Sequence, residues 1–399
     1  VYAFTATPEI HSGEEHFVIE RYIRPRATHS FGEMVEGETL FIFPFNHEKL
    51  PANEAFDIIS TKLQSLGARI LLFLNSIDEI EWCIDETHVG GQYIKESKVR
   101  DKAKQVTLIG QHNSQEEDEN WLLFEKSFPI LKSHNEVKIE IGFKLETDSK
   151  NQTESIIKVR SSPLFVYFPT EKETRFGFLV QGPYQTTPSR DNILDYDKRN
   201  HELVKETAVL ITEVLQYFKG MGMLTVSLLE ALPIRMDDFP QDNMFYPIVE
   251  AAYNAFMNEE LLPTDDGTFI TARNAKLARG ADLRELLSHD QLKQLFRSDH
   301  EIKWLSGEIT RDLTPDLRNY LTNKLKVQEI TPEVFARELS EEFLTNQTDD
   351  WFVRFYVYLL EQKALWGMLK RKPILRLQNN RLEIPFQPDG TPNAYLPPD

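Results

Sequence analysis

Apolar and polar residues alternate along much of the first half of the chain. The clearest alternation is followed by polar residues 147–151 and then resumes; its apolar members are Val137, Ile139, Ile141, Phe143 and Leu145, then Ile156, Ile157 and Val159. A period of two around a polar turn predicts a β-hairpin with one buried face.

Shorter strand-like segments repeat around this hairpin. They lie near residues 15–24, 38–45, 79–85, 104–110, 119–127, 155–168 and 176–182. Their close spacing from residue 79 onward predicts an antiparallel meander. Residues 115–119 are mostly acidic and lie between two of these segments, so we expect a solvated loop there.

The period changes to that of a helix from about Arg199. Apolar residues fall on one helical face at Leu203, Leu210, Ile211, Val214, Leu215 and Phe218, and Gly220 and Gly222 follow. A shorter helix is predicted between Pro51 and Gly67. Threonine–proline–acid steps at 314–316 and 331–333 predict two further helix starts. Residues 288–291, Ser-His-Asp-Gln, have the spacing of a capping box.

The C-terminal half contains a possible duplication. Helical stretches at 245–257 and 351–370 each lead into a proline-containing link, a polar turn and a short strand. The second stretch carries an aromatic and aliphatic stripe at Trp351, Phe352, Phe355, Tyr356, Leu359 and Leu360. We expect this stripe to be core; the alternative is a groove for a partner.

Composition narrows the classes of function. A length of 399 residues predicts two or three domains, and a formal net charge of −18 disfavours binding to nucleic acid or anionic lipid. No apolar run approaches the roughly 20 residues that span a bilayer. The single cysteine, Cys83, cannot form an internal disulfide, which favours a cytoplasmic location. We expect Cys83 to be buried in a core, with a catalytic thiol as the alternative.

Candidate chemistry concentrates between Gln181 and Asn192. Arg190 is the only permanent cation in this polar segment, which follows a predicted strand. An arginine at a loop tip can reach a phosphate and neutralise charge in phosphoryl transfer. The plain alternative is a solvated arginine or one paired with Asp191, and residue types alone favour that alternative. The ten histidines show no metal-ligand spacing, so no metal site is expected.

Lys172 and Arg175 lie just before this segment. Either side chain has the charge to approach a phosphate. Because Glu171 and Glu173 are interleaved with them, we expect a solvated turn instead.

Several stretches carry a resemblance to a known family. Residues 1–5 (Val-Tyr-Ala-Phe-Thr), the strand through Phe17 and residues 39–45 resemble the part of a GHKL ATPase that follows its last glycine-rich box. The loop up to Asn192 resembles the catalytic loop of the heat-shock-ninety middle domain, with residues 189–191 (Ser-Arg-Asp) at its arginine step. Overall the chain is most similar to bacterial sacsin-like ATP-binding proteins, above all over residues 168–174 and the following loop.

The resemblance implies an α+β chain in three parts. Residues 1–78 would complete the ATPase domain, 79–220 would form a coupling domain, and 221–399 a helical extension with short hairpins. Arg190 would be the catalytic-loop arginine. Gln181, Thr186, Thr187 and Ser189 would be the cofactor-binding residues that shape its loop.

The family's catalytic Glu, its magnesium-binding Asn and its Asp-x-Gly-x-Gly box do not occur in this chain. They are expected upstream of Val1. The full-length parent would therefore bind ATP and Mg²⁺ and hydrolyse ATP, whereas this segment alone would be inactive and need no cofactor.

The expected function is a segment of an ATP-dependent, chaperone-like conformational switch. Its expected partners are the upstream ATP-binding segment, protein clients and a possible second copy of itself, with no membrane and no nucleic acid. Two alternatives stay open: a non-catalytic interaction or scaffold module, and a nucleic-acid-associated ATPase, which the acidic charge disfavours.

Overall fold

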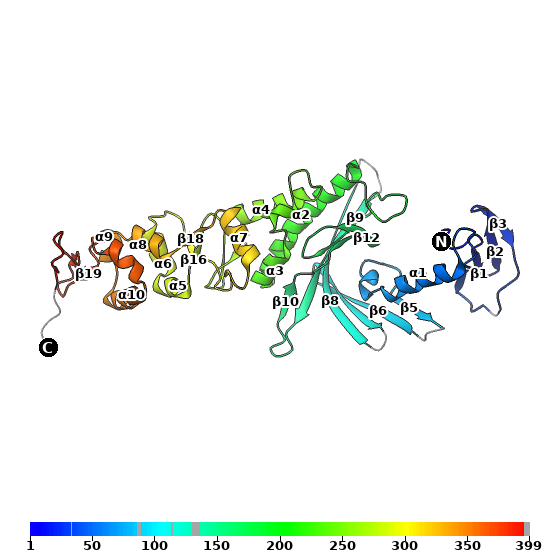
Figure 1. Cartoon of the computed structure of the whole chain (residues 1–399), viewed down its shortest axis with the longest axis horizontal. Coiled ribbons are helices and arrows are strands. Elements are labelled where there is room, and N and C mark those ends of the chain that lie inside the picture. Colours follow the sequence, from blue (N-terminus) through cyan, green and yellow to red (C-terminus); the bar gives the residue numbers. More distant parts are fainter. Residues whose placement is uncertain (33, 86–88, 113–114, 130–135, 395–399) are drawn as a thin grey trace. The chain divides into compact units, whose positions relative to one another are not determined.

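The computed structural model describes residues 1–32, 34–85, 89–112, 115–129 and 136–394 (Figure 1). Helices and antiparallel sheets both form large parts of it, which confirms the mixed α+β class. Two compact units are present: residues 1–96 with 107–119, and residues 97–106 with 120–399. The division into three domains at 78 and 220 stays a prediction. Within the described ranges, no helix is both long enough and apolar enough to cross a membrane.

The first unit begins with a small antiparallel sheet of order β3-β2-β1-β4. Its strands are β1 (Glu9–Ser12), β2 (Glu15–Glu20), β3 (Arg24–Ala27) and β4 (Thr39–Ile42). The strands predicted near 15–24 and 38–45 are thus confirmed as β2 and β4. Helix α1 (Ala52–Gln64) follows Pro51 as predicted, and a 3-10 turn, η1 (Ala68–Leu71), leads into a buried apolar run.

A nine-stranded sheet follows, with the order β12-β11-β13-β9-β8-β7-β6-β5 and β10 paired to β9. Its strands are β5 (Glu79–Ile84), β6 (Val89–Arg100), β7 (Ala103–His112), β8 (Gln115–Pro129), β9 (Glu136–Thr147), β10 (Glu154–Ile157), β11 (Pro163–Val166), β12 (Phe168–Glu173) and β13 (Leu179–Gln181). Strands β5 to β9 are neighbours in chain order, so the predicted meander is confirmed, although β6 was not predicted and the segment predicted at 155–168 forms two strands, β10 and β11. The β9–β10 hairpin pairs Thr147 with Glu154, as the alternation predicted.

Two sequence predictions about this sheet are wrong. Residues 115–119 are not a loop but the first part of β8. An antiparallel sheet tolerates charged side chains on a face that meets water, and Glu119 forms a two-pronged ion pair with Arg69. Cys83 is exposed, not buried, because alternation along β5 buries Trp82 and Ile84 and turns Cys83 to the other face. The Asp85 carboxylate raises the pKa of the Cys83 thiol, which disfavours a nucleophilic thiolate.

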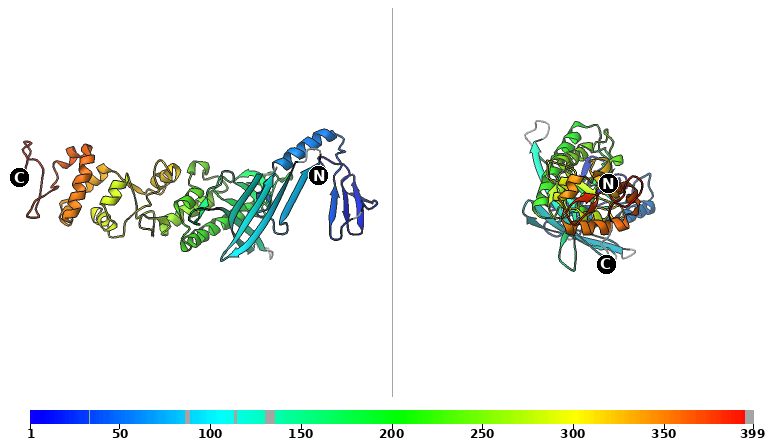
Figure 2. Two further views of the ribbon diagram at one scale, coloured as in Figure 1. Left: turned by 90° about the horizontal axis from the view of Figure 1, so that it is seen from below. Right: turned by 90° about the vertical axis from the view of Figure 1, so that its left-hand side faces the viewer.

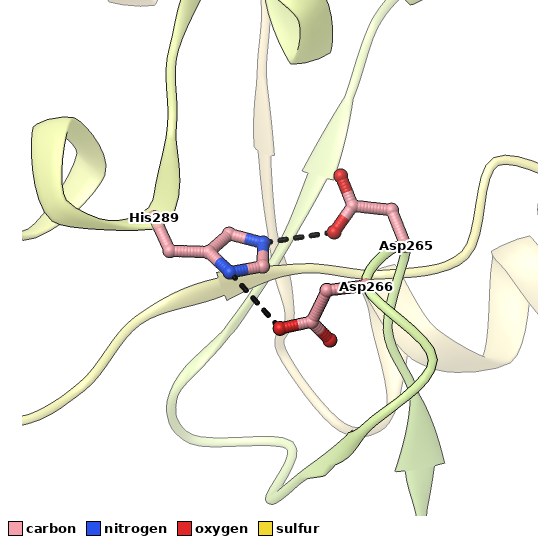
Figure 3. A group of neighbouring side chains, drawn as sticks. All are labelled: Asp265, Asp266 and His289. Carbon is pink, nitrogen blue, oxygen red and sulfur yellow. Dashed lines mark hydrogen bonds and ion pairs between the residues drawn. The ribbon is translucent and has the colours of Figure 1, made fainter.

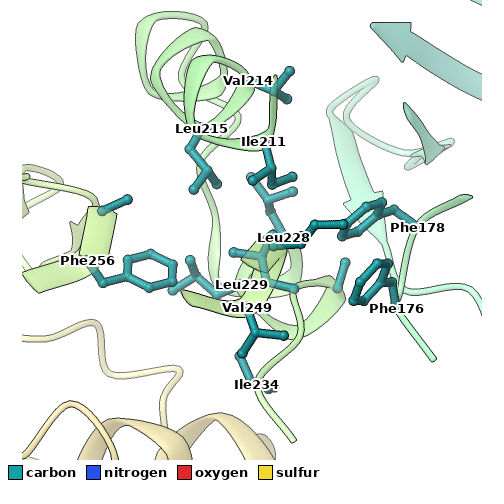
Figure 4. Packing of buried hydrophobic residues seen from close by; sticks show 14 of the residues in the cluster. Phe176, Phe178, Ile211, Val214, Leu215, Leu228, Leu229, Ile234, Val249 and Phe256 are labelled. Carbon is teal, nitrogen blue, oxygen red and sulfur yellow. The ribbon is translucent and has the colours of Figure 1, made fainter. Parts of the chain in front are cut away.

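Helix α2 (Lys198–Gly220) covers part of the sheet and supplies the centre of the larger core (Figure 4). Asp197 caps it by accepting from the backbone N–H groups of Arg199 and Asn200. The ring of Phe218, which is fully buried, lies 5.2 Å from that of Phe143. Burying one such side chain stabilises the fold by about 1.5–3 kcal/mol. Helix α4 packs along α2 (Figure 1, Figure 2).

The remaining chain is mainly helical, with three small sheets. Its elements are α3 (Val226–Ala231), η2 (Met236–Asp238), α4 (Tyr246–Asn258), β14 (Leu262–Pro263), β15 (Phe269–Ile270), β16 (Ala275–Ala278), α5 (Ala281–Leu286), α6 (His289–Leu295), β17 (Lys303–Trp304), α7 (Pro315–Asn323), β18 (Gln328–Ile330), α8 (Pro332–Glu338), α9 (Glu341–Thr345), α10 (Asp349–Glu361), η3 (Lys363–Leu365), α11 (Trp366–Leu369), β19 (Leu375–Arg376) and β20 (Leu382–Glu383). The two predicted helix-plus-hairpin units correspond to α4 with β14–β15 and α10–α11 with β19–β20.

The predicted helix starts are all present. Ser288 and Gln291 form the capping box, and Thr331 caps α8 through the N–H of Val334. Thr314 does not cap α7 with its side chain, because its hydroxyl bonds to the backbone of Thr310 instead. Proline at the first position of α7 still starts the helix there.

Helix α10 contributes Trp351, Phe352, Phe355, Tyr358 and Leu359 to a second core, which also includes residues of α5, α6 and α8. The rings of Trp351 and Phe355 stack with centroids 4.9 Å apart, and the Trp351 indole donates to the Leu286 carbonyl. The expectation that the stripe is core is confirmed for Trp351, Phe352, Phe355 and Leu359. It is wrong for Leu360, of which 65% is exposed.

Candidate functional site

The segment from Gln181 to Asn192 leaves β13 and forms a narrow loop whose two stems are held by Asn200 on α2. The amide of Asn200 is fully buried, and its Oδ1 accepts from the Gln185 N–H at 2.6 Å. Its Nδ2 donates to the carbonyls of Gln185 and Leu194, both at 3.0 Å. One buried side chain therefore joins both stems to a rigid helix. Sequence reasoning missed this residue, because nothing in the helical pattern distinguishes it.

The tip of the loop is organised around the carboxylate of Asp191. The hydroxyls of Thr187 and Ser189 donate to its Oδ1 at 2.6 and 2.7 Å. These bonds, Thr187 first, hold the pKa of Asp191 below its usual value. The alternative that Asp191 pairs with Arg190 is therefore not what the structure contains.

Arg190 lies at the tip with a left-handed backbone, φ 61°. Its N–H donates to the Thr187 carbonyl at 2.9 Å, which closes a turn through Pro188. A non-glycine residue in this region is strained by about 1–2 kcal/mol, so the surrounding bonds must hold it there. The side chain is exposed, and among the described residues none forms an ion pair or hydrogen bond with its guanidinium.

A cavity of about 260 Å³ lies beside this arginine. Arg190 and Thr186 line it from the loop, and residues 166–170 at the β11–β12 turn line it from the sheet. Small-molecule pockets usually measure about 300–1,000 Å³. The cavity is thus large enough for a phosphate group but too small for a whole nucleotide.

The other predicted site residues take different positions. Thr186 is half-buried and shares the cavity with Arg190. Thr187 and Ser189 bind Asp191, and so they shape the tip without offering their hydroxyl protons to a ligand. Gln181 is buried, and its Oε1 accepts from the Tyr167 N–H at 3.0 Å. Gln181 therefore holds the base of the loop and does not line the cavity.

Lys172 and Arg175 both have carboxylate partners. Lys172 Nζ lies 2.7 Å from Asp195 Oδ2, and Arg175 Nη1 lies 3.2 Å from Asp238 Oδ1. Neither side chain is free in the way that Arg190 is. The backbone N–H of Glu171 also donates to the Asp191 carbonyl, which joins β12 to the loop tip.

A second polar cluster was not predicted as a unit. Asp265 and Asp266, in the β14–β15 turn, meet His289 at the start of α6 (Figure 3). His289 Nε2 lies 2.8 Å from Asp265 Oδ1, and its Nδ1 lies 3.4 Å from Asp266 Oδ2. The turn and the capping box were both recognised in the sequence, but their proximity depends on the fold.

The chemistry of this cluster favours a structural tie over a metal centre. Lys303 Nζ already lies 3.2 Å from Asp266 Oδ2 and would repel a cation. Although burial opposes it, hydrogen bonds from Thr264, Thr268 and Lys303 hold the pKa of Asp266 far below its usual value. Both nitrogens of His289 face carboxylates, so an ion would have to displace existing contacts. The cluster joins the β14–β15 turn to α6 and β17.

Comparison with known proteins does not assign the chain to a family. No protein-family model, no curated protein and no solved structure matches the chain.

Proposed function

We propose that this chain is the coupling segment of an ATP-driven conformational switch of GHKL type, similar to sacsin-like and heat-shock-ninety-like proteins. In this proposal Arg190 contacts the terminal phosphate of ATP held mostly by an upstream segment. The observation that supports it is the exposed Arg190 guanidinium, which has no partner among the described residues and lies on a loop whose stems are fixed by the buried Asn200.

Arg190 would act on the phosphoryl group through the permanent charge and the planar shape of its guanidinium. Negative charge on the transferring phosphoryl oxygens is stabilised by a planar, forked donor that is always protonated. ATP and Mg²⁺ would be bound by the upstream segment. Contact between Arg190 and phosphate would couple nucleotide state to the position of the loop.

The test uses the protein extended upstream to include its ATP-binding segment. Arg190→Ala should lower ATP turnover by about 10³-fold, in the range known for arginines that stabilise phosphoryl transfer. ATP binding should change much less. Arg190→Lys should recover little activity, because an ammonium lacks the guanidinium fork.

Arg175→Ala is the matched control. Arg175 is also an exposed arginine with a left-handed backbone, φ 62°, but its side chain pairs with Asp238. We expect the Arg175→Ala protein to turn over ATP within about two-fold of the rate of the unsubstituted protein, because most surface ion pairs contribute little energy. Equal turnover in the Arg190→Ala and unsubstituted proteins would refute the role of Arg190. Absence of ATP binding in the extended protein would refute the proposed class.

A non-catalytic interaction module is the second candidate. It is favoured by three apolar side chains of α10, Val353, Val357 and Leu360, which the described part of the chain leaves more than half exposed. Partner binding that persists in an extended protein unable to bind nucleotide would support it.

A further inference from the structure

Helix α10 buries one face in the second core and exposes a second apolar stripe. Val353, Val357 and Leu360 are 63%, 57% and 65% exposed. They are spaced by four and three residues, so they form one line along the helix. Single exposed apolar residues need no explanation, but an aligned set marks a candidate contact surface.

Two hollows lie along this stripe. The first, of about 360 Å³, is lined by Val353 and Val357 together with residues of α5. The second, of about 260 Å³, is almost wholly apolar and is lined by Leu360, Trp366 and Phe386, among others. Pockets of this kind accept the large apolar anchors that dominate protein interfaces.

Acidic residues surround the first hollow. Asp282 and Glu285 line it from α5 and Glu361 lines it from the end of α10, whereas Arg354 is the one cation that lines it among the described residues. Three carboxylates and one guanidinium give this lining a formal charge of −2. The Arg354 guanidinium is itself directed to the Glu285 carbonyl, at 2.9 Å.

A buried hydroxyl in the same hollow lacks a partner. Tyr358 is only 6% exposed, and its hydroxyl has no hydrogen-bond partner among the described residues. Burial and the nearby carboxylates of Asp282 and Glu333 raise its pKa. A buried polar group without a partner is costly, so this hydroxyl destabilises the packing beside the hollow.

We propose that this face, the α10 groove, binds a basic amphipathic helix of a partner protein. The groove is defined by Val353, Val357 and Leu360 with their two hollows and the acidic rim. The partner's apolar side would cover the stripe, with one large side chain in the second hollow. Its lysines or arginines would face Asp282, Glu285 and Glu361.

The acidic charge of the chain favours a basic partner helix over a second copy of the chain as the occupant of the α10 groove. At a formal net charge of −18, two copies repel each other, and the acidic rim would face a like-charged surface. A basic helix is attracted to the rim from a distance and matches the helical spacing of the stripe. The proposal does not depend on the assignment of Arg190.

The probe is a fluorescent peptide of about five helical turns, with leucines on one face and lysines beside them. Its binding to this chain is followed by fluorescence anisotropy at low and at physiological salt. The reference peptide has the same composition in a scrambled order, so that it keeps the charge but loses the apolar face. We expect binding of the first peptide to be at least ten-fold tighter than that of the second.

Variants locate the binding surface. Val357→Asp should weaken binding at least ten-fold, because it places a charge in the apolar contact. Leu360→Ser tests the second hollow independently. Val209→Asp adds the same charge at an exposed position of α2 and should have less than a two-fold effect. Asp282→Asn with Glu285→Gln should reduce the salt dependence of peptide binding.

Two outcomes would overturn the proposal. Equal affinity for the scrambled peptide, or equal effects of Val357→Asp and Val209→Asp, would mean that the peptide binds the acidic surface in general. Self-association of the free chain that Val357→Asp abolishes would make a second copy the occupant instead.

Discussion

Replacement of Asn200 by alanine tests whether one buried amide holds the loop that carries Arg190. The side chain makes three hydrogen bonds, accepting from Gln185 N–H and donating to the carbonyls of Gln185 and Leu194. Alanine keeps the helical backbone of α2 but removes all three bonds. The Gln185 N–H then loses its partner, whereas the carbonyls of Gln185 and Leu194 each lose one of two donors and keep a backbone N–H, that of Leu194 and of Asp197.

The magnitude follows from the burial of this group. A net hydrogen bond contributes about 0.5–1.5 kcal/mol, and an unsatisfied buried group costs about 1–3 kcal/mol. Water that enters the loop stems would recover part of this. Alanine also regains a few tenths of a kcal/mol through its higher helix propensity. We therefore expect Asn200→Ala to lower the free energy of unfolding by about 2–4 kcal/mol, a large share of the usual 5–15 kcal/mol.

Urea unfolding measures the stability, and amide hydrogen exchange of a peptide that covers the loop measures the local effect. Exchange should accelerate at Gln185, whose N–H the Asn200 side chain protects. Asn254→Ala is the control, since Asn254 is an exposed asparagine in helix α4. Its substitution should change stability by less than about 0.5 kcal/mol. If Asn200→Ala lowers the free energy of unfolding by less than about 1 kcal/mol and leaves hydrogen exchange at Gln185 unchanged, Asn200 does not hold the loop.

Two further substitutions test the packing and the electrostatics of the same unit. Gly177→Ala would place a Cβ 2.5 Å from Ala231 Cα. Urea unfolding should therefore show that the free energy of unfolding falls by at least about 1–3 kcal/mol. Gly220→Ala is the control: its Cβ meets no atom within 4 Å, so the free energy of unfolding should hardly change. Asp266 has a lowered folded-state pKa, so its stabilisation is present above the unfolded value of about 3.9 and is lost as the pH falls further. The difference in melting temperature between the unsubstituted protein and Asp266→Asn should therefore narrow between pH 5 and pH 2; a constant difference would contradict this.

Local pattern predicted the elements well where one face is buried and the other meets water. Alternation from Val137 to Leu145 located β9 and its hairpin, and the helical period after Arg199 located α2. The same logic failed at Cys83 and at residues 115–119. Whether a strand's second face is covered depends on what packs there, and a strand of charged residues reads as a loop when its neighbours are unknown.

The same limit applies to the candidate site: single residues could be noted in the sequence, but contacts between distant residues could not be predicted. Arg190 was noted from its residue type and its place after a strand, but only the family resemblance favoured it as a site residue, and that role stays a prediction. The amide that fixes its loop, Asn200, and the contacts of His289 with Asp265 join residues distant in the chain. Spacing along one element carries no signal for such contacts, so only the folded chain brings them together.

The Arg190 guanidinium does not pair with the Asp191 carboxylate because the hydroxyls of Thr187 and Ser189 are favoured as its partners. Thr187 and Ser189 reach that carboxylate across four and two residues, and their short side chains lose little conformational freedom in doing so. An arginine would have to immobilise a long side chain on the surface for a weakly stabilising ion pair. The hydroxyls therefore keep the carboxylate, and the guanidinium stays available. An exposed guanidinium beside a cavity, with no carboxylate partner among the described residues, motivates a search for an anionic ligand.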